Sequence, residues 1–263
     1  AGAELLRPLT RSHFDSDINF VTNKGGVMGI STIEGYSQPT RRFAQLHASL
    51  EGKPVNPTAV MFGTFHPGTD FFGVFEKLYN IRYLLLLREN RVVFLTGGFG
   101  EAWFSNRIEY VEDFPQLARS LYVDLSKDRL EIVKSDAFAP RWRGSEVFSS
   151  ACSRTRIDSI DVELGGQKIG IETNNDIPCP LTVSTNFLSR VRAVATSSSG
   201  AKTLLAAFPG YGALLSMIVP AQTRRIDIEF PACEPGWSEV VFWSGALFML
   251  ASLLLFRRLR KRA

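Results

Sequence analysis

The stretch IDVELGGQKIGI, residues 160–171, decides the fold of the second half of the chain. On both sides of Gly165-Gly166, apolar residues alternate with polar ones, a period of two that is typical of strands. Successive side chains of a strand point to opposite faces, so the apolar residues of this stretch share one face on each side of the two-residue turn. We therefore expect a β-hairpin with one buried face.

Further strand patterns follow this hairpin. Turn signals at residues 197–200, at Pro209-Gly210 and at Pro220 separate segments with strand character. Short strands at about ten-residue spacing are typical of a β-sandwich or a barrel-like module. We expect an antiparallel β-sandwich-like module over residues 129–236, with strands at residues 181–187, 190–196, 203–208, 213–219 and 225–230.

Helical spacing dominates the earlier part of the chain. Residues 40–50 place apolar side chains three and four positions apart, which predicts a short amphipathic helix with Thr40 as its N-cap. A second helix is expected to run to Tyr79, capped by Thr69 or Asp70.

A third helix is expected over residues 113–125, opened by Asp113 with Pro115 in its first turn. Two strands are expected between the second and third helices, at residues 81–87 and 91–96. The first 128 residues therefore form a mixed α+β region in this interpretation, and the fold class of the chain is α+β.

The C-terminal segment has the composition of a membrane span. Residues 240–256 contain no charge, Pro, Asn or Gln, and as a helix these 17 positions cover about 26 Å. With Trp237 at one interface, we expect a transmembrane helix over residues 237–256 and a basic tail over residues 257–263. A buried C-terminal helix is the alternative, but such helices rarely lack every polar break and end in a basic cluster.

The charge of the chain is concentrated in that tail. The formal net charge is +4, but five of the 30 basic residues lie in residues 257–263, which leaves 25 basic against 26 acidic residues elsewhere. Phosphate binding needs clustered Lys and Arg, so a body of net charge −1 argues against a nucleic-acid partner. The length and the charged fraction of 21% also exclude a disordered chain.

The positive tail predicts a location as well as a partner. Basic residues beside a span stay in the cytoplasm, so we expect residues 257–263 inside, the bulk of the chain outside, and the lipid bilayer as a partner. The sequence opens without Met or an apolar signal segment. We therefore expect it to be the C-terminal piece of a longer protein.

Cysteine and histidine spacing predicts no metal site and no cofactor. Cys152, Cys179 and Cys233 show no CxxC pattern, so one disulfide with one thiol left over and three reduced core residues are both open. The three histidines, His13, His47 and His66, lie far apart in sequence, without HExxH spacing.

The chain also shows no recognisable catalytic set. It contains no GxSxG elbow, P-loop, GxGxxG turn or kinase motif. Carboxylates close together in sequence are expected on the solvated faces of their segments rather than in an acid–base pair. These are Asp15 with Asp17, Asp158 with Asp161, and Asp227 with Glu229.

Several segments, taken in order, carry a family resemblance. They are residues 19–46 with Gly35-Tyr36 and Arg41-Arg42-Phe43, residues 78–84, residues 101–106, residues 182–187, and the last strand with its Pro and membrane helix. In this order the chain resembles the C-terminal part of the YfhO-like bacterial membrane proteins. These belong to the GT-C type glycosyltransferases, which transfer a sugar from a polyprenyl-phosphate carrier on the outer face of the membrane.

The resemblance implies a role but no catalytic residue. In GT-C enzymes a carboxylate on the first extracytoplasmic loop acts as base or metal ligand, and that region is not in this sequence. After the strand at residues 182–187 the family carries a Trp and an Asp-Gly turn, whereas residues 188–195 here read LSRVRAVA, so no role is carried over for that loop.

Aromatic and basic residues close together in loops are the candidate ligand-binding residues. Aromatic rings stack on sugars, and planar Arg or Asn groups bind hydroxyls and phosphates. Core-edge packing or a solvated loop is the structural alternative for each cluster, and contact with lipid headgroups is a further one for the third. The clusters are Tyr36 with Arg41 and Arg42, Trp103 with Asn106, and Arg141, Trp142 and Arg143.

Two functions of different classes remain open. In the first, the chain is the extracytoplasmic domain and last span of a GT-C-like glycosyltransferase and helps to position a lipid-linked sugar donor or an acceptor. In the second, it is a non-catalytic, membrane-anchored surface protein that binds a glycan or a neighbouring membrane subunit.

Overall fold

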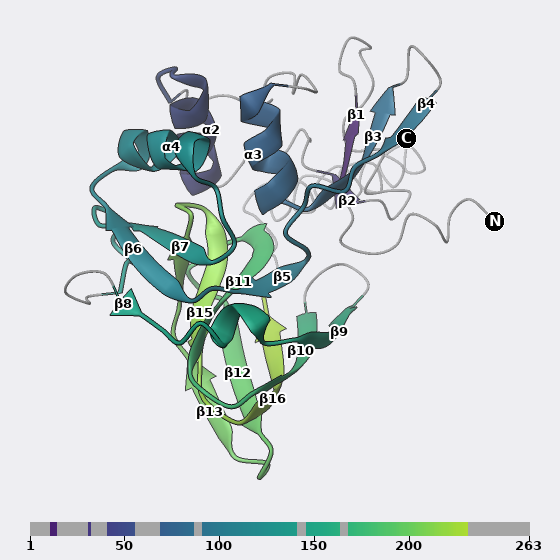
Figure 1. Cartoon of the computed structure of the whole chain (residues 1–263), viewed down its shortest axis with the longest axis vertical. Helices are drawn as coiled ribbons and strands as arrows, with labels where there is room; N and C mark the ends of the chain where they lie inside the picture. Colours follow the sequence, from purple (N-terminus) through teal and green to yellow (C-terminus); the bar gives the residue numbers. More distant parts are fainter. Residues whose placement is uncertain are drawn as a thin grey trace, which may run out of the picture. The chain divides into compact units, whose positions relative to one another are not determined.

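The structure is a computed structural model that describes residues 11–14, 31–32, 41–55, 69–86, 91–140, 146–163 and 168–230. The expected membrane span and basic tail, residues 237–256 and 257–263, lie outside these ranges. No helix within the described ranges is long and apolar enough to cross a membrane. The fold of these ranges is α+β, as expected, with three α-helices and four sheets (Figure 1).

The three helices lie where the sequence predicts them, and two of them have side-chain N-caps. The Phe72 N–H donates to Thr69 Oγ1 over 3.2 Å, and the Gln116 N–H donates to Asp113 Oδ1 over 2.8 Å. Each cap satisfies a backbone donor that the first turn leaves open. The helices are α2 (Arg41–Glu51), α3 (Asp70–Leu78) and α4 (Phe114–Val123).

Two smaller sheets accompany the helices. One has the order β2-β1-β3-β4, in which β3 and β4 confirm the two strands expected between the helices. In the other, ordered β7-β6-β8, α4 connects the parallel strands β6 and β7, so that these elements form a βαβ unit. The strands are β1 (Arg11–Phe14), β2 (Ser31–Thr32), β3 (Ile81–Leu86), β4 (Arg91–Phe94), β6 (Arg107–Val111), β7 (Arg129–Val133) and β8 (Glu146–Val147).

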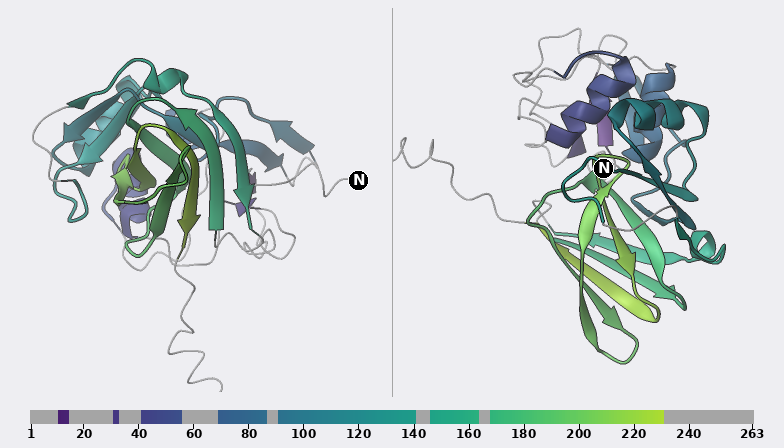
Figure 2. Two further views of the ribbon diagram at one scale, coloured as in Figure 1. Left: turned by 90° about the horizontal axis from the view of Figure 1, so that it is seen from below. Right: turned by 90° about the vertical axis from the view of Figure 1, so that its left-hand side faces the viewer.

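Two larger antiparallel sheets face each other in a sandwich (Figures 1 and 2). The first has five strands in the order β13-β12-β16-β10-β9 and is called the five-stranded sheet. The second has the order β14-β15-β11-β5, and the name four-stranded sheet is kept for it below. The strands are β5 (Ala102–Phe104), β9 (Ile157–Val162), β10 (Lys168–Asn175), β11 (Cys179–Asn186), β12 (Arg192–Ser197), β13 (Lys202–Leu205), β14 (Ala207–Gly210), β15 (Leu214–Val219) and β16 (Thr223–Glu229).

The hairpin that decides the fold is confirmed as β9 and β10. Ile169 lies opposite Val162 and Ile171 opposite Ile160, so the apolar residues of both strands share one face. Ile169 and Ile171 are buried in the core between the two large sheets. The alternation of apolar and polar residues in the sequence therefore corresponds to the alternation of inward and outward side chains along β9 and β10.

The four-stranded sheet is buried on both faces. Leu181 and Val183 of β11 belong to the core between the two large sheets. Thr182 and Ser184, which alternate with them, are also buried, and the hydroxyls of Thr182 and Ser216 are 3.0 Å apart and share a hydrogen bond. A second core beneath the helices includes Trp103 of β5 and packs on this side.

The expected single strand at residues 203–208 is wrong, because this segment contributes to two sheets. β13 ends at Leu205 in the five-stranded sheet, and β14 begins at Ala207 in the four-stranded sheet. Leu205 is buried in the sandwich core, whereas Phe208 is buried in the core beneath the helices. The run of apolar residues hides this crossing, since each side of Ala206 reads equally well as strand.

Elements from both sides of residue 129 share sheets and cores. β5 pairs with β11, and β6 pairs with β7. The contacts of the chain group Ala1–Phe230 into one unit and Pro231–Ala263 into a second. The expected division between residues 128 and 129 therefore runs through paired strands.

Of the two cysteine alternatives, the structure contains the disulfide. Cys152, in the 3-10 turn η2 (Cys152–Arg154), is bonded to Cys179 at the start of β11, with Cα atoms 5.5 Å apart. Both residues are fully buried. The bridge ties the connection before β9 to the sheet that lies between the two cores. Cys233 lies outside the described residues.

Candidate ligand-binding face

The outer side of the five-stranded sheet carries a hollow of about 520 Å³. It lies over β9, β10, β16, β12 and the start of β13, on the side away from the sandwich core. We call this surface the charged face. Four acidic and four basic side chains line it: Asp161, Glu163, Asp227, Glu229, Lys168, Arg192, Lys202 and Arg225.

Strand register brings these charges together in rows. Glu229 of β16 lies opposite Lys168 on one neighbouring strand and opposite Arg192 on the other. One row further along, Asp227 lies opposite Gly170, and Gly170 lies opposite Asp161 of β9. Side chains opposite each other in an antiparallel sheet have Cβ atoms about 5 Å apart, so the row of Lys168, Glu229 and Arg192 forms a continuous polar surface, whereas Gly170 leaves a gap in the next row.

A glycine at the centre of the face makes room for an arginine. A Cβ added to Gly170 would lie 2.7 Å from Arg225 Nη2, so the guanidinium occupies the space that a side chain at this position would take. Glycine inside a strand weakens the strand and often marks a close approach of another group. Gly170 therefore shapes the floor of the hollow.

Two carboxylates hold that guanidinium in place. Arg225 Nε donates to Asp227 Oδ1 over 2.8 Å, and Arg225 Nη1 donates to Glu172 Oε1 over 3.3 Å. The hydrogen bond and the charge of Asp227 raise the pKa of Arg225, with further contributions from Glu172 and Asp161. Exposed ion pairs of this kind add little stability, so the need for a stable fold does not explain the arrangement.

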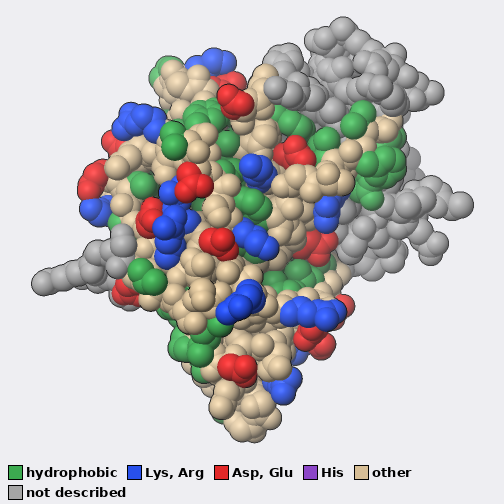
Figure 3. Space-filling model, in the orientation of Figure 1, with side chains coloured by type: hydrophobic (Ala, Val, Ile, Leu, Met, Phe, Trp, Pro, Cys, Tyr) green, Lys and Arg blue, Asp and Glu red, His purple; other side chains and the backbone are tan. Residues whose placement is uncertain are grey.

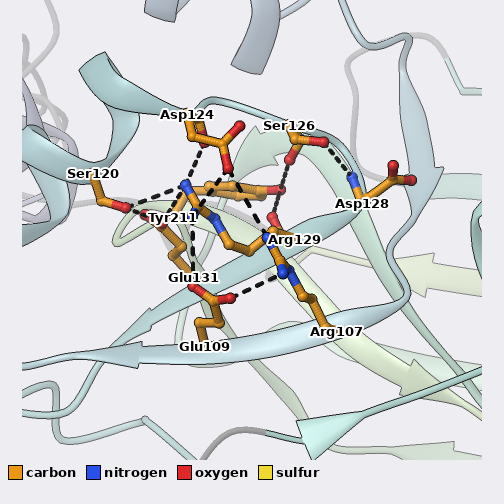
Figure 4. Close-up of polar contacts among 9 residues, drawn as sticks. All are labelled: Arg107, Glu109, Ser120, Asp124, Ser126, Asp128, Arg129, Glu131 and Tyr211. Atoms are coloured by element: carbon orange, nitrogen blue, oxygen red, sulfur yellow. Dashed lines mark hydrogen bonds and ion pairs between the residues drawn. The ribbon is translucent and has the colours of Figure 1, made fainter.

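A second polar cluster lies in the helical half, with Arg129 and Glu131 largely buried at its centre (Figure 4). Arg129 Nη2 lies 2.9 Å from Glu131 Oε1, and its Nη1 lies 3.3 Å from Asp124 Oδ2. The Ser120 hydroxyl also donates to Glu131 Oε1. The Glu131 side chain is 1% exposed, and burial raises its pKa.

Tyr211 connects this cluster to the turn between β14 and β15. Its hydroxyl donates to the backbone carbonyl of Arg129, and its N–H donates to the carbonyl of Glu131 over 2.7 Å. Tyr211 and Gly212 both adopt a positive φ, and a Cβ on Gly212 would lie 2.7 Å from Phe114 of α4. Because the central residues Arg129, Glu131 and Tyr211 are largely buried and fix a turn against α4, the role of the cluster is structural.

Arg42, a candidate ligand residue, is already engaged within the protein. Its Nε and Nη2 donate to the two carboxylate oxygens of Asp136 over 2.6 and 2.8 Å. The guanidinium carbon also lies 5.0 Å from the ring centre of Phe138 and 5.1 Å from that of Phe187. This bidentate, stacked arrangement ties α2 to the loop after β7 and to the end of β11, and leaves little of Arg42 open to a ligand.

The other candidate residues do not gather at one site within the described ranges. Arg41 is exposed at the start of α2. Trp103 is 4% exposed and packs against Phe99, so its ring is a core residue rather than a stacking surface. Asn106 is half-buried, and its backbone N–H donates to the Asp128 carbonyl over 2.9 Å. The remaining four candidates, Tyr36, Arg141, Trp142 and Arg143, lie outside the described residues.

The charged face was not among the predicted sites. Asp161, Asp227 and Glu229 were expected to be solvated charges, and their side chains are indeed exposed. Their position on one surface depends on strand order, because β16 lies between β10 and β12 in the sheet although it comes last in the sequence. Gly170, a break in an otherwise regular alternation, was the one local signal for the hollow.

The surface charge is otherwise mixed. Acidic and basic side chains are interspersed on the side of the molecule in Figure 3, without a large block of one sign. Among the described residues, no group of three His, Cys, Asp or Glu side chains could hold a metal ion.

A smaller apolar hollow of about 300 Å³ opens beside the edge strand β13. Its lining includes Phe138, Pro140 and Leu204, of which Leu204 is 70% exposed.

No family model, curated protein or solved structure matches the chain.

Proposed function

We propose that the chain is the extracytoplasmic C-terminal domain and last span of a GT-C-like, polyprenyl-phosphate-sugar-dependent glycosyltransferase of a bacterial cytoplasmic membrane. In this proposal the domain positions a donor or an acceptor, while an upstream membrane region carries out the transfer. Its partners are the bilayer, a lipid-linked sugar or glycan, and the other membrane segments of the same enzyme.

The charged face is the observation that carries this proposal. Sugars present many hydroxyls, each of which donates and accepts hydrogen bonds, and the hollow presents carboxylates and cationic side chains next to one another. Arg225 is held in place by Asp227 and Glu172, so part of the surface is fixed before a ligand arrives. Preorganised polar groups of this kind improve binding because less freedom is lost on association.

The disulfide and the order of elements support the same proposal. Disulfides persist in oxidising compartments such as the bacterial periplasm, and Cys152 is bonded to Cys179. Strand β16 ends at Glu229, and the sequence then leads to the expected span at residues 237–256. A folded module directly before a span and a basic tail fits an outside domain with a cytoplasmic C-terminus.

A non-catalytic surface protein is the second candidate. One observation favours it: the central groups of the charged face, Arg225 and Asp227, are paired with each other, which suits binding better than proton transfer. Such a protein would use the same face for a glycan or for a neighbouring subunit.

The sequence encoded upstream of Ala1 separates the two candidates. Several upstream spans with an Asp or Glu on the first extracytoplasmic loop are the expected result for a glycosyltransferase. Replacing that carboxylate with Ala should then abolish sugar transfer in membranes while leaving this domain folded. An upstream region that holds only a signal peptide would refute the enzyme proposal.

A further inference from the structure

We infer that the charged face binds a neutral, hydroxyl-rich glycan directly through Asp161, Arg192 and Glu229. This inference rests on the proposed function and makes it more specific, because it assigns the face to the acceptor side of the reaction rather than to the phosphate-bearing donor.

The three residues are free to meet a ligand. Among the described residues, none forms an ion pair with Asp161, Arg192 or Glu229, and the side chains of all three are exposed. By contrast, Lys168 Nζ lies 3.7 Å from Glu163 Oε1. The guanidinium of Arg225 is held by the carboxylates of Asp227 and Glu172. Lys202 also lines the hollow, is exposed and forms no ion pair with a described residue. The hollow therefore contains a fixed set of paired charges and a free set of two carboxylates and two cations.

The free set contains both acceptors and donors. Ionised carboxylates only accept hydrogen bonds, and guanidinium groups only donate them. A hydroxyl does both, so one sugar can donate to Asp161 or Glu229 and accept from Arg192. Phosphate only accepts hydrogen bonds, so it can use Arg192 and Lys202 but neither Asp161 nor Glu229.

The charge around the hollow points the same way. Its lining holds four acidic and four basic side chains, so its formal charge is zero. The guanidinium at its centre, Arg225, is already neutralised by Asp227 and Glu172. A face without net charge gives an anionic headgroup no overall attraction, so matched hydrogen bonds rather than charge favour the ligand.

The size of the face suits an oligosaccharide. Asp161 on β9 and Arg192 on β12 are separated by β10 and β16, and three strand spacings amount to about 14 Å. The volume of about 520 Å³ lies within the usual range for small-molecule sites. None of the described residues that line the hollow is aromatic, so hydrogen bonds rather than ring stacking would determine which sugar binds.

The test measures binding to the full chain in detergent by isothermal titration calorimetry. The neutral probes are cellohexaose, chitohexaose and mannohexaose, and the anionic probes are inorganic phosphate and mannose 1-phosphate. At least one neutral hexasaccharide should bind, with a Kd that changes little between about 50 and 500 mM NaCl, because screening acts on charged ligands. The anionic probes should not compete with it.

The variants connect this binding to the face. Replacing Asp161 and Glu229 together with Ala should weaken it by about ten- to hundredfold, the effect of losing hydrogen bonds to charged groups. Asp158→Ala is the matched control, since Asp158 is an exposed carboxylate of β9 outside the lining. Gly170→Ala, which displaces the Arg225 guanidinium, should weaken binding even if the double variant fails to fold.

Three outcomes would overturn the inference. They are the absence of binding by every neutral hexasaccharide, a Kd unchanged in folded double and Gly170→Ala variants, and competition by either anionic probe. The proposed function fails on a different result, the upstream sequence. A chain preceded only by a signal peptide that still binds a neutral glycan here would refute the enzyme and leave this inference standing.

Discussion

Opening the disulfide between Cys152 and Cys179 should destabilise the domain by an amount that follows from its place in the chain. Both residues are fully buried, and the bond joins η2 to the first residue of β11 across a sequence separation of 27. A cross-link restricts the unfolded chain, and a loop of this length removes about 12 cal/mol/K of entropy from it. The folded state therefore gains about 3.5 kcal/mol at room temperature.

The same figure predicts a change in melting temperature. Each kcal/mol shifts the midpoint by about 2–4 °C in domains of roughly this size. The reduced domain should therefore melt about 7–14 °C below the oxidised one. The slope of urea unfolding should be somewhat larger for the reduced domain, because its unfolded chain is less restricted and exposes more surface.

The assay compares oxidised and reduced protein on a Cys233→Ser background, so that the third cysteine cannot exchange. Because neither bridged sulfur is exposed, the reduced form is prepared by unfolding and refolding in reductant. Urea unfolding is followed by the fluorescence of tryptophan, which includes the buried Trp103. A Cys152→Ala/Cys179→Ala double variant is the control. A difference below about 1 kcal/mol between the folded forms would refute the loop-entropy reasoning.

Three further predictions concern single residues. Asp136→Ala removes both hydrogen bonds that hold Arg42 and should cost about 2–3 kcal/mol in urea unfolding; a loss near zero would show that the pair is not stabilising. Asp113→Ala removes the N-cap of α4 and should cost about 1 kcal/mol, measured in the same way, whereas Asp113→Asn should cost much less. Burial lowers the pKa of His47 from 6.5 to about 4, so the unfolded chain takes up this proton first and stability should fall by up to about 3 kcal/mol as the pH drops through that window. His47→Gln should flatten the pH profile between these values, and an unchanged slope would contradict the assignment.

Local patterns in the sequence predict the elements well. The alternation on both sides of Gly165-Gly166 corresponds to β9 and β10, and the caps Thr69 and Asp113 open α3 and α4. These predictions succeed because each depends on interactions between residues that are near neighbours in sequence. The fold class follows from the same signals.

Features that depend on partners far away in sequence could not be predicted. The segment around Ala206 passes from one sheet to the other because Leu205 and Phe208 pack in different cores, and both cores suit apolar residues equally. The engagement of Arg42 depends on Asp136, 94 positions away. The charged face depends on the order of strands, which places Asp161 and Arg192 on one surface. Pairing across such distances leaves no periodic signal.

The four-stranded sheet that lies between the two cores has a consequence for how this domain tolerates change over time. A strand with one solvent-exposed face tolerates substitution at about every second residue. β11 has a core on each side, and every residue from Cys179 to Ser184 is buried. A change at Leu181 disturbs the sandwich, and a change at Thr182 disturbs the layer beneath the helices. We therefore expect this stretch to diverge most slowly in any descendants of the chain, so that CPLTVS is the part of the sequence best suited to finding its distant relatives.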